Sequence, residues 1–390
     1  MQNTLSKSAR LKVLFAGISS LILSMGIARF AYTPLLPVMV SEAGLSPAGG
    51  AWLAAINYSG YLFGVILASR ISHAGLKNQL YRWGMVLALL STMLMAISTD
   101  FYILAVSRFV AGLSTAAGLM LGSGLILNWL MRNQYRSELG IHFSGIGFGI
   151  VISSFAAMLM HQQVHWDMQW YLLAALSILF LIPALAWFPP PPADEQSLNQ
   201  YPTMQHAPPN ARFMRLFTAA YFCMGFGYVV TATFMVAIIN QLPGLSKVGG
   251  WMFLLSGIFA IPSCILWDLI ARKTGDVNAL ILASLLEVAG IIAPTLGWGL
   301  SGAVLGAVLY GATAIAVVSL TLTMAGRYYP AQPAKMMGKM TIAYGVAQII
   351  APALTGWLTD GEGGYEAGLY AAAGVMLFGS YLFYLMRKAQ

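Results

Sequence analysis

Charged residues are scarce in this sequence, and acidic ones are the scarcer kind. Of its 390 residues, 8% are charged and 59% are hydrophobic, with 20 lysines and arginines against 12 aspartates and glutamates. A soluble domain carries roughly 25% charged residues. The few charges also leave apolar runs of about 20 residues, long enough to cross a hydrocarbon core of ~30 Å. The scarcity of charge therefore excludes a soluble fold and predicts an all-α integral membrane protein.

Signatures of catalysis are absent as well. The spans contain no His/Asp/Glu metal cluster and no Ser/His nucleophile arrangement, so we expect no enzyme activity, no metal and no cofactor. The sequence lacks a Gly-x-x-x-x-Gly-Lys-Ser/Thr loop to cradle phosphates, which argues against ATP-driven transport. The two cysteines, Cys223 and Cys264, both lie in apolar segments, where a thiol behaves as a small hydrophobe. The net charge of +8 resides in short loops and forms no basic stripe, so we expect no nucleic-acid partner.

What the sequence does contain is a series of apolar runs that predicts twelve membrane spans. Their even number places both termini on one side of the membrane. Between the ninth and tenth spans the chain stays uncharged, and Pro294, Gly297, Gly299 and Gly302 supply the turn. The predicted spans are residues 11–40, 47–71, 80–99, 101–131, 138–160, 168–188, 212–241, 247–270, 277–296, 299–325, 338–358 and 366–387.

The basic residues predict the orientation of these spans. Of the 20, 17 lie on the side of the termini, Lys247 alone lies on the opposite side, and Arg29 and Arg108 fall within spans. Cytoplasmic loops of membrane proteins carry the excess of lysine and arginine. We therefore expect both termini in the cytoplasm.

A polar segment divides the chain into two parts of similar length. Residues 189–211 open with four prolines, Pro189 to Pro192, and close soon after Pro208-Pro209. Such a composition is typical of an extended, semi-rigid linker. We expect an N-terminal six-helix bundle at 1–188 and a C-terminal six-helix bundle at 212–390, related by pseudo-symmetry. Two repeats of this kind give alternating access by rocking against each other.

With six plus six spans, a central linker and both termini on one side, the chain resembles the major facilitator superfamily over essentially its whole length. Arg108-Phe109-x-x-Gly112 is similar to the arginine motif at the start of the fourth span, and Gly145-x-Gly147-x-Gly149 resembles the glycine-rich motif of antiporters without its proline. The stretch from Gly26 to Pro37 resembles the first-span signature of the YbfB/YjiJ-type branch. The resemblance implies a secondary transporter of the bacterial inner membrane, in a branch associated in part with multidrug efflux.

The loops after the second and eighth spans depart from the superfamily. An aspartate is usual there and helps to lock the two bundles in one state, but Ser72 and Arg272 stand at the corresponding positions. Asp268 precedes Arg272 by four residues and could pair with it. Exposed pairs of this spacing are worth only about 0.3–0.5 kcal/mol.

Arg29 is the most informative single residue. An arginine in the middle of a span costs at least ~2.5–3.5 kcal/mol unless it faces partners or a watery cavity, so we expect it to point inward. Tyr32 lies at i+3 on the same face. Further polar or amphipathic residues well inside spans are predicted to line the cavity with these two: Asn57, Tyr58, Tyr228, Trp251, Tyr310, Tyr344 and Gln348.

Four residues are candidates for proton coupling. Glu287 is the only carboxylate well inside a span, and buried carboxyl groups exchange protons closer to neutral pH than exposed ones do. Glu138 and His142 are four residues apart near the inner end of the fifth span and can meet on one helix face. Arg108 joins them through the family resemblance. For each, a purely structural role is the alternative.

The leading prediction is proton-coupled export of amphiphilic small molecules, and the alternative is proton-linked uptake of a small organic anion. Aromatic walls with few fixed charges, together with the family resemblance, favour proton-coupled export of amphiphilic small molecules by antiport. Arg29 and Arg108 favour proton-linked uptake of a small organic anion, because fixed positive charge attracts carboxylates. In either case we expect a monomer surrounded by membrane lipid, with protons and a small-molecule substrate as its partners.

Overall fold

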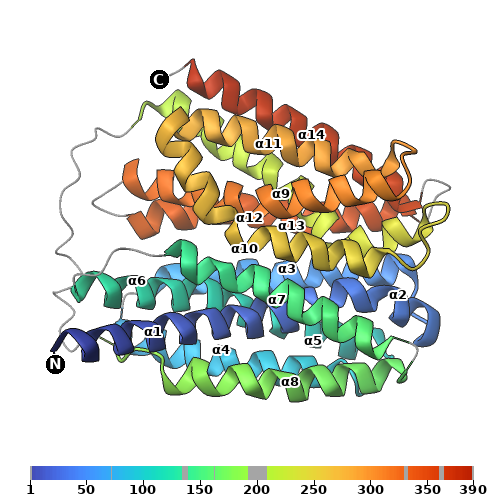
Figure 1. The fold of residues 1–390 in the computed structure, drawn as a ribbon, viewed down its shortest axis with the longest axis horizontal. Helices are drawn as coiled ribbons and strands as arrows, with labels where there is room; N and C mark the ends of the chain where they lie inside the picture. Colours follow the sequence, from blue (N-terminus) through green and yellow to red (C-terminus); the bar gives the residue numbers. More distant parts are fainter. Residues whose placement is uncertain are drawn as a thin grey trace.

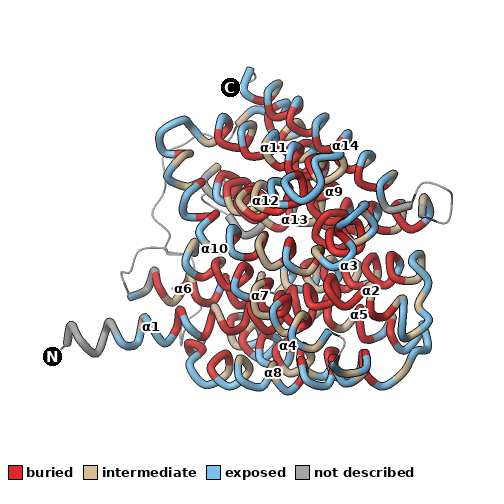
Figure 2. Tube along the Cα trace, turned by 45° about the vertical axis from the view of Figure 1, so that its right-hand side comes forward, coloured by how far each residue is buried: buried red, intermediate tan, exposed pale blue. Residues whose placement is uncertain are grey.

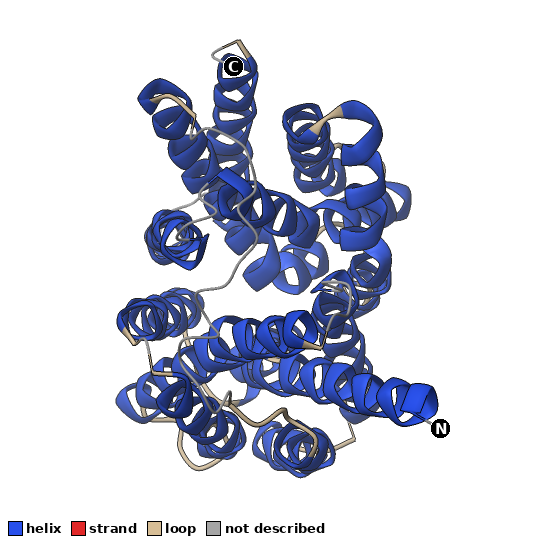
Figure 3. Cartoon of the chain, turned by 90° about the vertical axis from the view of Figure 1, so that its left-hand side faces the viewer, coloured by secondary structure: helices blue, strands red, loops and turns tan. Residues whose placement is uncertain are grey.

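The computed structural model describes residues 2–71, 73–133, 139–161, 163–191, 209–328, 333–359 and 364–388. Throughout these ranges the regular secondary structure is helical and no strand is formed, as Figure 3 shows. Helices suit a bilayer because each one bonds its backbone N–H and C=O groups internally. The prediction of an all-α fold is confirmed.

Two of the spans in the first part of the chain contain a π-helix. The first span is a continuous rod of α1 (Gln2–Leu21), the π-helix η1 (Ile22–Phe30) and α2 (Tyr32–Glu42). The fourth joins α5 (Phe101–Ala116), the π-helix η2 (Ala117–Gly122) and α6 (Ser123–Arg132). π-turns are rare and are often found at functional sites. The other helices here are α3 (Pro47–Arg70), α4 (Ala74–Leu94), α7 (Leu139–Met160) and α8 (Trp166–Ala186).

The second part of the chain is built from longer, uninterrupted helices. They are α9 (Ala211–Gln241), α10 (Gly249–Thr274), α11 (Asp276–Ile292) with the short 3-10 helix η4 (Ala293–Thr295), α12 (Leu300–Tyr328), α13 (Pro333–Thr359) and α14 (Gly364–Arg387). Among the described residues, eleven helices are long and apolar enough to cross a membrane. The remaining rod, α4, carries Lys77, Asn78 and Arg82 in its first half.

The boundaries of α4 correct the predicted third span at 80–99. The helix begins at Ala74, because the His73 side chain accepts a hydrogen bond from the Leu76 N–H and so caps its first turn. It ends at Leu94, and the chain then turns before Asp100 caps the next helix. Hydropathy alone misplaced the span because the polar first turns of α4 lie outside the apolar run.

The turn between the ninth and tenth spans forms where it was predicted. Gly297 and Gly299 have φ angles of 74° and 56°, in the left-handed region that side chains other than glycine disfavour. Gly302 instead lies within α12, where a β-carbon would lie 2.5 Å from the Ala293 carbonyl oxygen. This glycine therefore serves close packing and is not part of the turn.

Small residues at helix crossings let backbones meet. Gly26 of η1 faces Gly149 of α7, and a β-carbon on either would collide with the backbone of the other. Gly60 of α3 lies in the same way against Phe109 of α5. Such contacts give helices a close fit in lipid, where no hydrophobic force drives them together.

The helices lie side by side in two layers (Figure 1), with α9 to α14 on one side and α1 to α8 on the other. Contacts between the layers run mainly through α3 with α13 and α7 with α10, and α2 also meets α9. Buried residues line the helix faces that meet, whereas exposed residues cover the periphery (Figure 2). Both termini lie at one end; we call the opposite end the far end. The linker at 189–211 is described only at its edges, so the two-bundle division stays a prediction.

Candidate functional site

Arg29 lies near the end of η1, in the middle of the first span. Its side chain is 4% exposed, and its guanidinium carbon lies 4.3 Å from the centre of the Tyr58 ring and 5.1 Å from that of Tyr61. Within the described part of the chain, Nε and Nη2 of Arg29 have no hydrogen-bond acceptor. Each ring face offsets about 0.5–2 kcal/mol of the cost of burying the charge. The guanidinium is thus held in place while some of its donors remain available.

Arg108 of α5 is bound to the main chain of the first span. Its Nη1 donates to the Ala28 carbonyl at 3.0 Å and its Nη2 to the Arg29 carbonyl at 3.5 Å, while the guanidinium lies 4.3 Å from the Tyr32 ring centre. Residue 34 is proline, which brings no N–H to the turn that follows η1. Arg108 supplies donors at this place and fixes the backbone that carries Arg29.

Two other predicted cavity residues make similar links between helices. The Asn57 side-chain amide on α3 donates to the Arg108 carbonyl at 2.8 Å, and the Tyr32 hydroxyl donates to the Gly50 carbonyl at 2.9 Å. Within the described residues, the Asn57 side-chain oxygen has no partner. These bonds hold α2, α3 and α5 in register around Arg29.

One helical turn from Arg29 towards the far end, two hydrogen bonds join the two parts of the chain. The Thr33 hydroxyl donates to the Ala232 carbonyl at 2.6 Å, and the hydroxyls of Tyr58 and Thr233 lie 3.3 Å apart. Both bonds connect the first or second span with α9. We call this pair of contacts the far-end seal, because it closes the space beside Arg29 on that side.

Tyrosine rings from three helices of the second part form a cluster. The rings of Tyr221 and Tyr344 stack with centres 4.5 Å apart, and Tyr228 lies 5.8 Å from Tyr344 and 6.3 Å from Tyr310. The Tyr310 hydroxyl donates to the Tyr228 carbonyl at 3.0 Å. Among the described residues, the Tyr344 hydroxyl and the Gln348 side-chain oxygen have no partner. The cluster therefore presents unused polar atoms on an aromatic surface.

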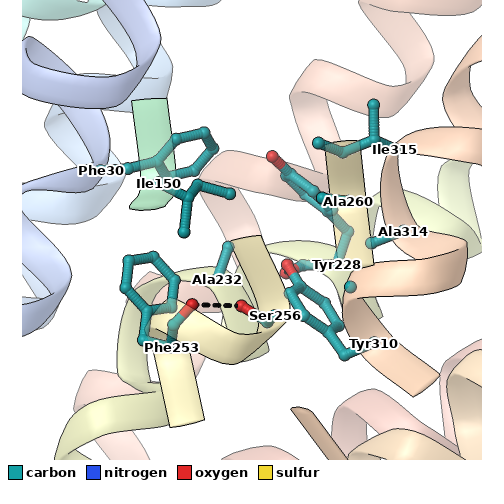
Figure 4. A pocket seen from close by; sticks show the side chains of 11 residues that line it. Phe30, Ile150, Tyr228, Ala232, Phe253, Ser256, Ala260, Tyr310, Ala314 and Ile315 are labelled. Atoms are coloured by element: carbon teal, nitrogen blue, oxygen red, sulfur yellow. Dashed lines mark hydrogen bonds between the residues drawn. The ribbon is translucent and has the colours of Figure 1, made fainter. Parts of the chain in front are cut away.

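A small cavity of about 10 Å³ lies between the two parts of the chain beside this cluster. Figure 4 shows Phe30 and Ile150 on one side of it and Tyr228 and Tyr310 on the other. Its polar edge includes Ser256, whose hydroxyl is bonded to the Phe253 carbonyl at 2.7 Å. We call it the central cavity, and its lining is Phe30, Ile150, Tyr228, Ala232, Phe253, Ser256, Ala260, Tyr310, Gly311, Ala314 and Ile315. It is apolar and aromatic, with hydroxyl groups at its rim.

Glu287 of α11 is buried behind the tyrosine cluster. Its side chain is 1% exposed, and within the described part of the chain neither carboxyl oxygen has a hydrogen-bond partner. Tyr228, Tyr310 and Tyr344 all lie within its electrostatic range. The structure thus places this carboxyl group next to the aromatic wall of the central cavity, although Glu287 itself does not line it.

His142 lies apart from these groups, between α7, the start of α6 and α1. It is fully buried, and its Nε2 is 2.8 Å from the Ser123 hydroxyl. A β-carbon on Gly17 would collide with its ring, so the first span packs directly on it. Glu138 lies outside the described residues, and its pairing with His142 stays a prediction.

The position of Trp251 corrects the prediction that it lines the cavity. Its side chain is 56% exposed in the first turn of α10 and is not part of the tyrosine cluster. A tryptophan near the end of a span favours the membrane interface, where its ring is apolar and its N–H is wet. Sequence alone did not show which face of α10 turns outward.

The loop pairing after the eighth span is confirmed. Arg272 Nη2 lies 2.5 Å from Asp268 Oδ2, and both side chains are half or more exposed. Ser72, in the equivalent loop after the second span, lies outside the described residues.

Sequence reasoning missed Tyr61, Phe30 and Ser256. Tyr61 follows Tyr58 by three residues on the same helix face, so helical spacing could have identified it. Phe30 and Ser256 carry no such signal, because an apolar ring or a helical serine is as common in packing as in a cavity. Only the approach of α10 and α12 to the first span brings them together.

Comparison with known proteins shows to which family the chain belongs. A family model described as "Uncharacterised MFS-type transporter YbfB" matches residues 21–384. The "Uncharacterized MFS-type transporter YceJ" of Bacillus subtilis (strain 168) is 23% identical over 278 residues, covering 68% of this chain and 69% of that protein.

Solved structures share the fold at low sequence identity. The nucleoside transporter NupG superposes with a TM-score of 0.72 at 14% identity, covering 97% of this chain and 99% of NupG. The human organic anion transporter MFSD10 (TETRAN) superposes with a TM-score of 0.67 at 17% identity, covering 96% and 99%. At such identities the likeness shows the fold alone.

Proposed function

The chain belongs to the family of YbfB, a group of MFS-type transporters, and we propose that it is a proton-coupled secondary transporter of a small organic anion with an aromatic or apolar body. Arg29 carries this proposal. It is a buried cation with N–H groups that no described residue accepts, next to a cavity with an aromatic lining. A carboxylate would accept two such hydrogen bonds in one plane, the contact for which arginine geometry is best suited.

The charge balance around the site favours an anion over a cation. In the described part of the chain, neither Arg29 nor Arg108 forms an ion pair; the ion pairs found there are His165–Asp167 and Arg272–Asp268. Two like charges 4 Å apart repel by about 4 kcal/mol at an effective dielectric constant of 20. Export of amphiphiles, the leading prediction from the sequence, would for a cationic substrate place another positive charge beside these two arginines. Neutral amphiphiles remain compatible with the aromatic lining.

Glu287 supports coupling to protons. An anion that moves with one proton carries no net charge, so the membrane potential, worth ~2.3 kcal/mol per charge per 100 mV, does not oppose its entry. The carboxyl group lies behind Tyr228 and Tyr310, which line the central cavity. Substrate and proton therefore occupy neighbouring sites in this proposal without sharing a ligand.

The arrangement of the helices in two layers supports a mechanism of alternating access. We propose that the bundles at 1–188 and 212–390 rock against each other, with both termini in the cytoplasm of a bacterium. The far-end seal would then close the periplasmic side in the state described here. Opening it requires that the bonds of Thr33 and Tyr58 to α9 break and that the packing of α2 on α9 separates.

The test is transport into proteoliposomes that contain the purified protein. A panel of aromatic carboxylates, neutral amphiphiles and lipophilic cations is offered with an imposed pH gradient, with and without sodium. We expect saturable accumulation of at least one carboxylate that follows the pH gradient and does not need sodium. Accumulation of the cations alone would favour export of amphiphiles and contradict the proposal.

A further inference from the structure

A second cavity lies inside the second part of the chain, away from the substrate site. It has a volume of about 20 Å³, enough for a water molecule, and lies between α9, α11, α12 and α14. We call it the far-end cavity; its lining is Thr231, Met235, Ile238, Ile239, Gly290, Ile291, Pro294, Gly306, Ala307 and Leu369. It shares no lining residue with the central cavity. No charged side chain contributes to it, so it is not built for an ion other than the proton.

Two polar groups in this apolar lining lack their usual partners. The Thr231 hydroxyl is buried, the residue being 4% exposed, and it has no hydrogen-bond partner among the described residues. The Gly290 carbonyl would ordinarily accept from the N–H of residue 294, but that residue is proline and has none. A buried polar group that stays unpaired costs about 1–3 kcal/mol. The cavity has room for a water molecule, and water needs two or more such partners to be held.

Glu287 lies one turn from this cavity. Gly290 and Ile291 line it and follow Glu287 by three and four residues on α11, which places all three on one helix face. Tyr228 of α9 and Tyr310 of α12, which line the central cavity, lie within electrostatic range of Glu287. The carboxyl group is thus close to residues of both cavities.

The opposite wall of the far-end cavity leads towards the surface. Pro294 is partly exposed, and residues 296–299 beyond it are exposed at the turn between α11 and α12. This turn lies at the far end of the molecule. The lining residue Pro294 therefore lies directly next to this exposed turn in the sequence.

We propose that the far-end cavity holds water that carries protons between the far-end surface and Glu287, by a route separate from the substrate path. The inference rests on the proposed function of Glu287 as the proton carrier. A protonated water transfers one proton to the carboxylate, which leaves a neutral water and a neutral carboxylic acid; release is the reverse. The titratable groups that face Glu287 are Tyr228 on α9, Tyr310 on α12 and Tyr344 on α13. From α14 comes the Ser380 hydroxyl, which is bonded to Ser284.

The experiment measures hydrogen–deuterium exchange at the carboxyl group in the full-length protein without any substrate. The carbonyl stretch of a protonated Glu287 is identified in the infrared spectrum as the band that Glu287→Gln removes. Its shift is then followed after transfer to D2O. Thr231→Val keeps the shape of the side chain and removes the hydroxyl. We expect it to slow the exchange by about tenfold, which corresponds to ~1.4 kcal/mol of barrier.

Two further variants control for side effects. Thr321→Val removes another buried threonine hydroxyl that has no described partner, on α12 and outside the lining of the far-end cavity; it should leave the exchange unchanged. Ala307→Val fills part of the cavity while residue 231 stays threonine, and it should also slow the exchange. Equal exchange in wild type, Thr231→Val and Ala307→Val would overturn the water route. If Glu287→Gln removes no band at any pH of a titration, the carboxyl group never takes up a proton, and the coupling role proposed for Glu287 is itself wrong.

Discussion

The two parts of this chain bury a basic and an acidic group in different ways. In the first part, Arg29 and Arg108 lie among tyrosine rings and main-chain carbonyls. Arg29 belongs to the first span with its π-helix, and Arg108 braces that span. In the second, Glu287 lies among three tyrosines on regular helices, with no described hydrogen-bond partner. The comparison teaches that Arg29 is held rigidly next to the central cavity, whereas Glu287 is separated from that cavity by tyrosine side chains. In the proposed function, the substrate binds at the first site and the proton at the second.

The largest effect is expected from removing the Arg29 guanidinium group. Arg29→Ala should weaken binding of an aromatic carboxylate by about 100-fold, because charge-assisted hydrogen bonds are worth ~1.5–3 kcal/mol each. Arg29→Lys should recover only part of this, since an ammonium group lacks the planar pair of donors. Equilibrium binding to purified protein measures both. Arg272→Ala, an exposed arginine at the end of α10, is the matched control and should bind like wild type.

Removing the Glu287 carboxyl group should separate binding from coupling. In Glu287→Gln, exchange of labelled for unlabelled substrate across the membrane should persist, because exchange needs no net proton movement. Accumulation driven by the pH gradient should disappear; for one coupled proton, that is a loss of about tenfold in accumulation per pH unit. Retained accumulation in this variant would move the proton site to another group, with His142 the next candidate.

A smaller effect is expected where the two parts meet. Tyr58→Phe removes the hydroxyl that faces Thr233 in the far-end seal. The loss of one neutral hydrogen bond, ~1 kcal/mol, should shift the equilibrium towards the far-end-open state by about fivefold. Labelling rates of a cysteine introduced near the seal would report this shift. If the rates do not change, this contact does not help to close the far end.

The smallest effect belongs to the loop after α10. Asp268→Asn breaks an exposed pair worth about 0.3–0.5 kcal/mol, so transport rates should change by less than about twofold. A larger change would show that this pair replaces the aspartate lock that other members of the superfamily use.

Sequence alone predicted those parts of the molecule whose structure the bilayer constrains most strongly. The spans and the burial of Arg29 follow because lipid excludes charge and unpaired backbone. The outward position of Trp251 could not be predicted, because helical spacing shows which residues share a helix face but not what that face packs against. The π-helix at Ile22–Phe30 did not follow either, since it depends on the close approach of Gly149 and on the donors of Arg108. Thr231 was missed because a threonine in a helix gives no sign that its hydroxyl lacks a partner.

The central claim is that the buried positive charge of Arg29 selects an anion. The most direct measurement compares the affinity of one aromatic carboxylate with that of its uncharged carboxamide, in wild type and in Arg29→Ala. The four affinities form a double-mutant cycle that isolates the interaction between the two charges. The account predicts that wild type strongly prefers the carboxylate and that Arg29→Ala binds both compounds with similar affinity. Equal affinities in wild type, or a preference for the carboxylate that survives Arg29→Ala, would contradict it.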